Sequence, residues 1–353
     1  MSTVIVGGGP GGAAAAIWLA RGGAHPLLLE RDAVVTEKVC GEFLAADAAQ
    51  RLDALGLDLA ALGAVPIRRA IFAAGGWQAE MRLPFAAWGL PRATLDAALL
   101  EAARAAGAEV VLGMHVRDAA QKGHLWRVRL DSGEAIETPS LVLATGKHEL
   151  RGLRRSAQHG AIGVKVPLRG PIPEAAILLL VCAGGYAGLQ PRPDGGANLC
   201  AALDPRAPGV TEAARSSTAL MAHVARGSAL AERVLAGLTP TNQRPLTIAG
   251  VPYGHVERGC NAFRVGDQAS VIPSFCGDGV AMALASGEVA AMAAIHGIAP
   301  RRFQAEWATR IKGGMRLASW ISGLTGHSPR LLVAGIAAAP RVAAFVAQRT
   351  RLG

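Results

Sequence analysis

The segment Thr3-Val-Ile-Val-Gly-Gly-Gly-Pro-Gly-Gly12 stands near the start of the chain and decides how the fold begins. Residues 4–6 form a short apolar run, which indicates a buried parallel strand. The alanine-rich residues 13–20 predict a helix, because alanine has the highest intrinsic helix propensity. Residues 27–29 predict a second buried strand, and the acidic Glu30 follows it. Strand, glycine-rich turn, helix, strand and acid in this order are typical of a dinucleotide-binding α/β unit.

Three glycines of the turn, Gly7, Gly9 and Gly12, match the pattern G-x-G-x-x-G. We expect the first to form the tight turn, the second to let the backbone approach a pyrophosphate, and the third to let helix and strand pack closely. The phosphates would lie at the helix N-terminus, where unpaired N–H groups favour negative charge. Glu30 follows at roughly the 20-residue distance expected of the acid that binds an adenosine ribose. A purely structural glycine turn is the alternative interpretation.

A second motif, far downstream, indicates which dinucleotide is bound. An expected strand ends in Gly266-Asp267, and a Pro-x-x-x-Gly-x-Gly turn with Gly277 and Gly279 precedes an expected helix over residues 280–295. This arrangement resembles the second fingerprint of FAD-dependent oxidoreductases of the p-hydroxybenzoate hydroxylase and geranylgeranyl reductase type. The resemblance implies that Asp267 binds the ribityl chain and that the turn directs the helix N-terminus toward the flavin pyrimidine ring. A helix N-terminus there would stabilise the negative charge of reduced flavin.

The resemblance implies further contacts to FAD. Arg92, in Pro-Arg-Ala-Thr-Leu-Asp, opens an expected helix and would contact the cofactor; a solvated arginine at a helix start is the alternative. Arg31, next to Glu30, and Val116, whose backbone would pair with adenine, complete the expected cofactor-binding set. NAD(P)H would act as the transient reductant of the flavin.

Three residues are candidates for catalytic groups. Cys40 lies in Lys-Val-Cys-Gly-Glu-Phe-Leu, which resembles the segment beside the isoalloxazine ring in geranylgeranyl reductase-like flavoproteins; it is alternatively a small buried apolar residue. His148, in Ala-Thr-Gly-Lys-His, is a candidate acid or base, or a polar surface residue. The aspartate that flavin monooxygenases often carry there is missing, which leaves the mode of NAD(P)H use open. Tyr186 would orient a polar group of the substrate, or belong to the surface or core of a sheet.

These motifs predict an α/β fold in which a Rossmann-type FAD-binding domain is interleaved with a β-sheet substrate domain and followed by C-terminal helices. We expect the FAD-binding domain to comprise residues 1–150 and 255–300. The substrate-binding sheet domain would comprise residues 151–254, and a helical cap residues 301–353. A chain of 353 residues is long enough to bury such cores.

The C-terminal tail is basic and apolar. No acidic residue follows Glu306, whereas seven arginines and lysines do. Residues 331–346 are almost entirely apolar and nearly long enough to span a membrane, but Pro340-Arg341 interrupts them. Two packed helices joined at the proline would cap the substrate cavity; alternatively, they would form a basic, apolar surface for peripheral contact with anionic lipid. Both interpretations suit a lipophilic substrate.

Composition argues against several other classes. The formal net charge is +10, but aromatic content is only 4% and no nucleic-acid-binding signature is present, so we expect no nucleic-acid partner. The five cysteines form no C-x-x-C pair, which predicts neither a disulfide framework nor a metal site. The first strand begins without a basic n-region before it, so we expect a cytoplasmic location.

The favoured interpretation is an FAD-dependent monooxygenase that uses NAD(P)H and O₂ to hydroxylate a lipophilic aromatic or polyketide-type secondary metabolite. The alternative is a flavin-dependent reductase or dehydrogenase acting on an isoprenoid-like or conjugated double bond, which Cys40 and the Ala-Thr-Gly sequence favour. A flavin halogenase is disfavoured because no Trp-x-Trp-x-Ile-Pro motif is present. An FAD-dependent tRNA-modifying protein would suit the positive charge, but no sequence feature requires it.

Overall fold

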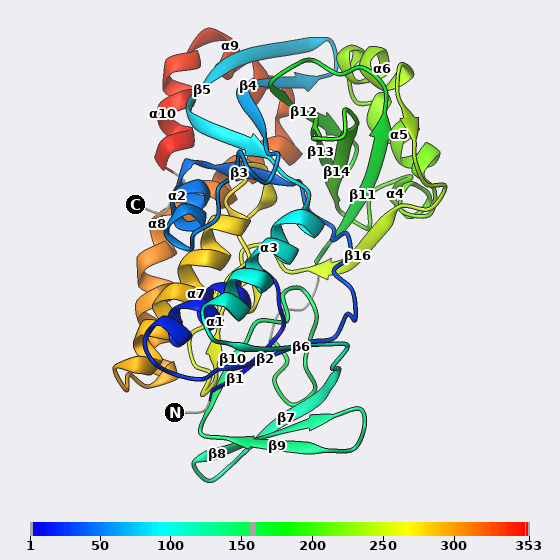
Figure 1. Ribbon diagram of the computed structural model, residues 1–353. Coiled ribbons are helices and arrows are strands. Elements are labelled where there is room, and N and C mark those ends of the chain that lie inside the picture. The colour runs from blue at the N-terminus through cyan, green and yellow to red at the C-terminus, as the bar shows by residue number, and fades with distance from the viewer. Residues whose placement is uncertain (1–2, 156–159, 350, 352–353) are drawn as a thin grey trace.

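The computed structural model describes residues 3–155, 160–349 and 351, and this part of the chain forms three β-sheets with flanking helices (Figure 1). The strands are β1 (Thr3–Val6), β2 (Leu27–Glu30), β3 (Phe43–Ala45), β4 (Val65–Ala74), β5 (Trp77–Gly89), β6 (Glu109–Leu112), β7 (Val116–Lys122), β8 (Leu125–Leu130), β9 (Ala135–Thr138), β10 (Ser140–Leu143), β11 (Ala161–Arg169), β12 (Ala176–Cys182), β13 (Gly185–Pro191), β14 (Ala197–Leu203), β15 (Thr239–Pro240), β16 (Leu246–Val251) and β17 (Phe263–Arg264). The α-helices are α1 (Pro10–Arg21), α2 (Ala46–Ala54), α3 (Arg92–Ala105), α4 (Val210–Ala213), α5 (Ser217–Ala225), α6 (Ala229–Ala236), α7 (Gly279–Ile295), α8 (Pro300–His327), α9 (Pro329–Ala338) and α10 (Pro340–Arg349). Short 3₁₀ turns η1 (Gly266–Gln268) and η2 (Ser274–Cys276) precede α7. The predicted α/β class with C-terminal helices is confirmed.

A parallel five-stranded sheet, in the order β17-β10-β1-β2-β6, carries the N-terminal motif. Val4 pairs with Leu27 of β2 on one side and with Leu141 of β10 on the other. Since alternate side chains of a strand point to opposite faces, the sheet is covered on both. Ile5 packs in the cluster formed with α1, α3 and α7, whereas Val4 and Val6 pack with the antiparallel sheet β7-β8-β9. Burial on both faces explains why β1 and β2 are continuous apolar runs.

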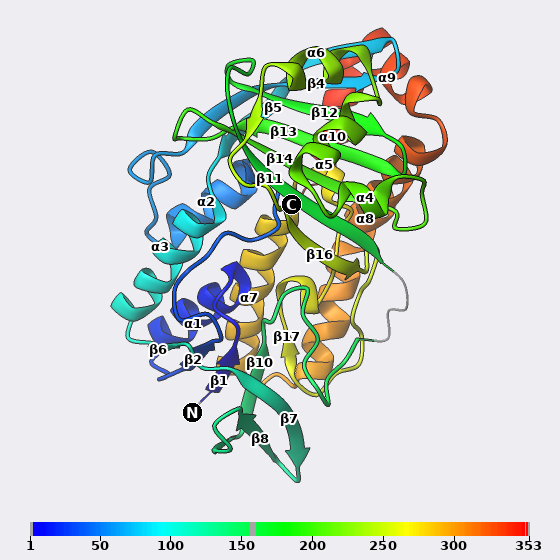
Figure 2. The same cartoon turned by 90° about the vertical axis from the view of Figure 1, so that its right-hand side faces the viewer.

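A nine-stranded mixed sheet forms the other half of the molecule. Its order is β15-β11-β14-β13-β12-β4-β5-β3, and β16 pairs with β11. Helices α4, α5 and α6 cover one face, where Leu220, Val224 and Leu235 join the cluster of buried residues (Figure 2). The opposite face carries Phe72 and Leu179 and lies toward the C-terminal helices.

The C-terminal helices connect the two halves. In Figure 1, α8 extends from the level of the parallel sheet toward the nine-stranded sheet, and Phe303 at its start contacts Phe263 of β17 with ring centroids 5.7 Å apart. Val333 and Ile336 of α9 pack in the cluster on the face of the nine-stranded sheet opposite α4–α6. Among the described residues, no single helix has the length and hydropathy needed to cross a membrane, and α9 and α10 meet at a bend of 111°.

The segment 43–89 contributes to the second half rather than to the first. β4 pairs in parallel with β12 and antiparallel with β5, so both strands extend the nine-stranded sheet. The helical residues between β14 and β15 are divided into α4, α5 and α6. Gly227 separates the last two, because its backbone packs so closely that a Cβ there would lie 2.1 Å from the carbonyl oxygen of Val181. Ser228 then caps α6 by accepting the N–H of Ala231.

Candidate functional site

A cavity of about 1270 Å³ lies between the parallel sheet, the nine-stranded sheet and the C-terminal helices. Its wall includes all but one of the candidate residues from the sequence: Gly7, Gly9, Glu30, Arg31, Cys40, Arg92, Val116, His148, Tyr186, Gly266, Asp267, Gly277 and Gly279. The exception is Gly12, which lies behind the turn; a Cβ there would be 2.0 Å from the carbonyl oxygen of Gly7. The structure thus brings the expected cofactor and catalytic residues to one cavity, while their individual roles remain predictions.

The glycine turn connects β1 to α1 without side chains in the way. Gly7 has φ = +108°, and a Cβ there would lie 2.4 Å from the carbonyl oxygen of Ala144, the residue after β10. Gly9 is the N-cap of α1, and no side chain caps the helix. The first N–H groups of α1 are therefore available to an anion at this end of the cavity.

Glu30, at the carboxyl end of β2, marks one end of the cavity. Its carboxylate accepts hydrogen bonds from the N–H of Gly8 at 2.6 Å and of Asp32 at 3.1 Å. The neighbouring Arg31 places its guanidinium 3.0 Å from the imidazole of His148, which follows β10. Burial and the charge of Arg31 lower the pKa of His148, so its neutral form is favoured. His148 therefore lies at the end of the cavity where the adenosine is expected.

Arg92 faces the glycine turn from the start of α3. Its guanidinium forms a two-pronged ion pair with Asp96, with distances of 2.9 and 2.8 Å, and its Nη2 atom lies 3.7 Å from the position of a Cβ on Gly9. Although burial lowers the pKa of Arg92, the Asp96 carboxylate raises it further, so the side chain stays cationic. A permanent cation beside an uncapped helix N-terminus fits a pyrophosphate.

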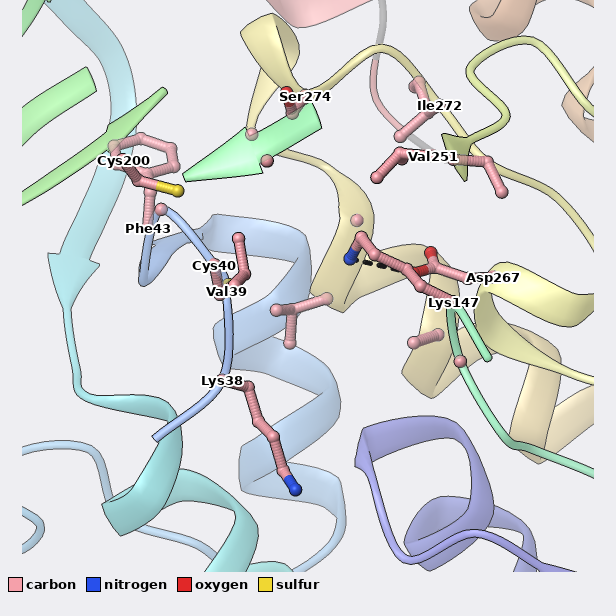
Figure 3. A pocket seen from close by; sticks show the side chains of 18 of the residues that line it. Lys38, Val39, Cys40, Phe43, Lys147, Cys200, Val251, Asp267, Ile272 and Ser274 are labelled. Carbon is pink, nitrogen blue, oxygen red and sulfur yellow. Dashed lines mark ion pairs between the residues drawn. The ribbon is translucent and has the colours of Figure 1, made fainter. Parts of the chain in front are cut away.

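Lys147 and Asp267 pair at 3.0 Å on one side of the cavity (Figure 3). The Asp267 carboxylate raises the pKa of Lys147, which keeps the lysine charged. Close by, α7 begins at Gly279 without a side-chain cap. Gly277 has φ = +74°, and a Cβ there would lie 2.7 Å from the ring of Phe43. The turn before α7 therefore requires glycine, and it leaves the helix N-terminus open to the cavity.

The loop around Cys40 forms the facing wall. Figure 3 shows Cys40 and Cys200 on the side of the pocket opposite the pair Lys147–Asp267. The amide of Asn198, on β14, donates to the carbonyl oxygens of Cys40 and Gly41, both at 3.1 Å. Burial raises the pKa of Cys200 to about 12, so this thiol is protonated at neutral pH. The Cys40 loop is thus attached to the nine-stranded sheet at the backbone.

A cluster of four charged residues reinforces this attachment. Lys165, on β11, lies 2.5 Å from both Glu37 and Glu42, and its side chain is completely buried. Arg192 pairs with Glu37 at 3.0 Å and with Glu42 at 3.5 Å. Glu42 adopts φ = +64° and also accepts the backbone N–H of Arg92 at 3.1 Å. The cluster therefore joins the Cys40 loop, β11 and the start of α3.

Three hydroxyl groups of the cavity wall form a chain. Tyr186, on β13, lies 2.5 Å from the hydroxyl of Ser274, which lies 2.8 Å from the hydroxyl of Tyr253. Burial raises the pKa of Tyr253. The ring of Tyr186 packs edge-on against Phe275 at 5.0 Å. A linked chain of this kind can hold or transfer a proton at the Tyr186 hydroxyl.

Beyond Tyr186 the cavity wall becomes apolar. The apolar arm is formed by residues of β4, β5, β12 and α8–α10: Phe72, Met81, Leu83, Phe85, Ile177, Leu179, Trp320, Ile321, Leu324, Leu331, Leu332, Ile336, Val342, Ala343 and Val346. Residues 331–346 were expected from the sequence to cap a substrate cavity, but the parts of the wall that come from β4, β5 and β12 were not identified, because they belong to distant segments. Reasoning from the sequence also gave Lys147, Glu42 and Cys200 no role, although the first two stand inside the quoted motifs. Among the described residues, no group of three histidine, cysteine or acidic side chains could hold a metal ion.

These residues fit FAD. The open glycine turn, the permanently charged Arg92 and the uncapped start of α1 suit its phosphates, and the carboxylates of Glu30 and Asp267 line the same cavity. Near the start of α7, the glycines present only backbone to the cavity. This leaves room for a flat ring there.

Comparisons with known proteins agree with this assignment. Residues 1–140 match the family model described as FAD binding domain. A menaquinone reductase of Mycolicibacterium smegmatis is 30% identical over 158 residues, which are 42% of this chain and 38% of that protein. The chain therefore matches well under half the length of this curated relative.

Solved structures share the fold over nearly the whole chain. A flavin-dependent brominase superposes with a TM-score of 0.81 at 17% identity, covering 99% of this chain and 93% of the other. A geranylgeranyl bacteriochlorophyll reductase-like protein of Thermoplasma acidophilum gives a TM-score of 0.74 at 16% identity, covering 100% and 93%. At such identities the likeness shows the fold alone. Residues 1–140 thus match an FAD binding domain, and the whole chain shares its fold with the flavin-dependent brominase and the geranylgeranyl bacteriochlorophyll reductase-like protein.

Proposed function

We propose that the protein is an FAD-dependent oxidoreductase that reduces a lipophilic substrate, with NAD(P)H as the donor that reduces the flavin. The observation that carries the proposal is the continuity of the cavity of about 1270 Å³. One part of its wall is the FAD-binding set around Gly9, Arg92 and Asp267, and another is the apolar arm beyond Tyr186. A substrate in the arm would therefore meet the cofactor without crossing bulk water.

The apolar arm supports an elongated hydrocarbon substrate. Its walls are carbon side chains from both the nine-stranded sheet and the C-terminal helices, including Phe72, Leu179 and Ile336. Burial of a methylene group contributes about 0.8 kcal/mol, so an isoprenoid chain gains affinity with each unit that enters the arm. A polar metabolite would gain nothing from this wall.

The residues near the junction support proton transfer to the substrate. FAD, when bound, supplies the exchange of two electrons. Tyr186 Oη would donate the proton that completes the reduction of a double bond, and Ser274 and Tyr253 would replace it through their linked hydroxyls. Cys40 and the loop it belongs to would be kept beside the ring by Asn198.

Two reactions are candidates for this site. The stretch similar to a menaquinone reductase favours reduction. The second candidate is the NAD(P)H- and O₂-dependent monooxygenase that acts on a lipophilic aromatic compound or polyketide. The hydroxyl chain is compatible with it, since Tyr186 could equally accept the proton of a phenol.

Product analysis distinguishes the two reactions. The purified FAD-loaded protein would be incubated with NADPH or NADH and a short-chain isoprenoid quinone, with and without O₂. We expect a product with two added hydrogen atoms that forms equally well without O₂. A product with one added oxygen atom, formed only in air, would instead support the monooxygenase. Oxidation of NAD(P)H that releases only peroxide with every quinone and phenol tested would contradict both.

A further inference from the structure

We propose that the protein docks on anionic phospholipid membranes through a surface at the outer end of the apolar arm. We call it the mouth surface and define it by four exposed apolar side chains and four arginines: Trp320, Leu331, Val342, Phe345, Arg316, Arg330, Arg341 and Arg349. All belong to α8, α9 and α10, and α9 and α10 lie beside β4 and β5 of the nine-stranded sheet (Figure 1).

The apolar members are unusually exposed for their size. Trp320 is 63% exposed, Leu331 73%, Val342 60% and Phe345 54%. Single exposed apolar residues are common on protein surfaces, but a cluster of large ones marks an interaction site. Tryptophan and phenylalanine are also the side chains that favour the interface between water and lipid.

The same residues form the opening of the cavity. Trp320, Leu331 and Val342 line the cavity wall and are exposed on the outside of the protein. They stand on three different helices, so the cavity wall reaches the outside of the protein at the mouth surface. A lipid that enters the apolar arm would pass between these side chains.

Charge complementarity identifies the partner. Arg316 and Trp320 are four residues apart on α8, and Phe345 and Arg349 are four apart on α10, so each pair shares a helix face. The guanidinium of Arg349 stacks over the ring of Phe345 at 4.9 Å. None of the four arginines forms an ion pair with any residue that the structure describes, and no acidic residue follows Glu306 in the sequence. Basic residues interleaved with apolar ones suit a surface of anionic lipid headgroups.

The geometry favours lying on the bilayer over crossing it. α9 and α10 have ten residues each and meet at 111°. A helix of that length spans about 15 Å, which is half the thickness of the hydrocarbon core. A second copy of this chain is a poorer partner, because a two-fold contact would bring the same arginines face to face.

Docking on a membrane would give the proposed enzyme a route for its substrate. Only this route, and not the docking itself, rests on the proposed function. A lipophilic substrate would move from the bilayer into the apolar arm without entering water. The binding itself is measured without turnover, so loss of binding and absence of reductase activity are separate results.

Flotation with lipid vesicles tests the proposal. The FAD-loaded protein would be mixed with vesicles of phosphatidylcholine alone or of phosphatidylcholine with phosphatidylglycerol. We expect flotation with the mixed vesicles and little with the neutral ones. Each basic residue at an anionic surface contributes about fivefold to partitioning. The double variant Arg341→Ser/Arg349→Ser should therefore partition roughly thirtyfold more weakly.

A matched control removes two charges elsewhere. Lys122 and Arg127 are exposed on the β7–β8 hairpin, at the other end of the molecule (Figure 1). Lys122→Ser/Arg127→Ser should float like the wild type, whereas Phe345→Ser should bind more weakly with unchanged FAD content. The proposal is overturned if the wild type stays in solution with the mixed vesicles or if both double variants lose binding equally. A vesicle-free dimer that Phe345→Ser dissociates would assign the surface to a second copy and would also overturn it.

Discussion

Lys165 Nζ lies 2.5 Å from Glu42 Oε1, and their side chains are 0% and 1% exposed. The pair joins β11 of the nine-stranded sheet to the residue that follows Cys40 and Gly41. Burial raises the pKa of Glu42 even with a lysine beside it, whereas hydrogen bonds from Lys165 and Arg192 outweigh the effect of burial and lower the pKa of Glu37. The buried ammonium lies equally close to both carboxylates, and it attaches the Cys40 loop, part of the cavity wall, to β11.

Replacing Lys165 by methionine should destabilise the protein. The variant leaves Glu42 buried without its main partner, and removal of one member of a buried ion pair costs about 3–5 kcal/mol in the free energy of unfolding. Urea denaturation of Lys165→Met against the wild type measures this difference. The double variant Lys165→Met/Glu42→Gln should recover much of the loss, because no unpaired carboxylate remains.

The deficit of Lys165→Met should depend on pH. Without the lysine, the pKa of Glu42 rises further in the folded protein, so the folded state holds a proton that the unfolded state releases. The loss of stability relative to the wild type is then smallest below the ordinary pKa of glutamate and grows as pH rises toward neutrality. The range from about pH 4 to about pH 7 begins near the ordinary pKa of glutamate. A loss of stability that is constant over this range would contradict this account of Glu42.

Asp267→Ala should weaken FAD binding. A hydrogen bond to a charged group contributes about 1.5–3 kcal/mol, which corresponds to a loss of affinity of roughly 10- to 100-fold. Titration of the apoprotein with FAD, followed by flavin fluorescence, gives the dissociation constant. Asp204→Ala, which removes a carboxylate paired only locally with Arg206, is the control and should bind FAD normally. Wild-type affinity of Asp267→Ala would remove Asp267 from the cofactor site.

Tyr186→Phe should slow turnover and leave FAD affinity unchanged. General acid catalysis contributes about 10²- to 10⁴-fold to a rate, and the phenyl ring preserves the packing on Phe275. Steady-state rates across a pH series would show the loss together with a changed pH profile, which a packing defect alone would not produce. Tyr253→Phe, at the far end of the hydroxyl chain, should have a smaller effect. Equal rates for wild type and Tyr186→Phe at every pH would exclude the proton-donor role.

Cys200 should resist alkylation in the folded protein. Burial raises the pKa of Cys200 to about 12, so the thiol stays protonated near neutral pH, and the thiolate is the reactive form. Treatment with iodoacetamide followed by peptide mass spectrometry measures the modification, with urea-unfolded protein as the reference. Labelling of Cys200 as fast in the folded as in the unfolded protein would show that this thiol is neither buried nor protonated as described.

The local elements could be predicted from sequence because their signals are local. The glycine pattern, the apolar runs of β1 and β2 and the acid at Glu30 all lie within 30 residues, and the structure has each where expected. The motif before α7 was recognisable for the same reason. The charged cluster could not be predicted from the sequence. Lys165 and Glu42 are 123 residues apart, and no pattern in one of the two segments indicates a partner in the other. The position of β4 and β5 in the nine-stranded sheet likewise depends on pairing with β12, which alternation along a strand does not reveal.

The central claim is that a lipophilic substrate in the apolar arm takes electrons directly from FAD. The measurement that tests it most directly is anaerobic stopped-flow mixing of the reduced, FAD-loaded protein with an isoprenoid quinone. The account predicts rapid return of the oxidised flavin spectrum without O₂, at a rate that rises with the length of the isoprenoid chain until the arm is filled. A flavin that stays reduced with every quinone and is reoxidised only when O₂ is admitted would contradict it.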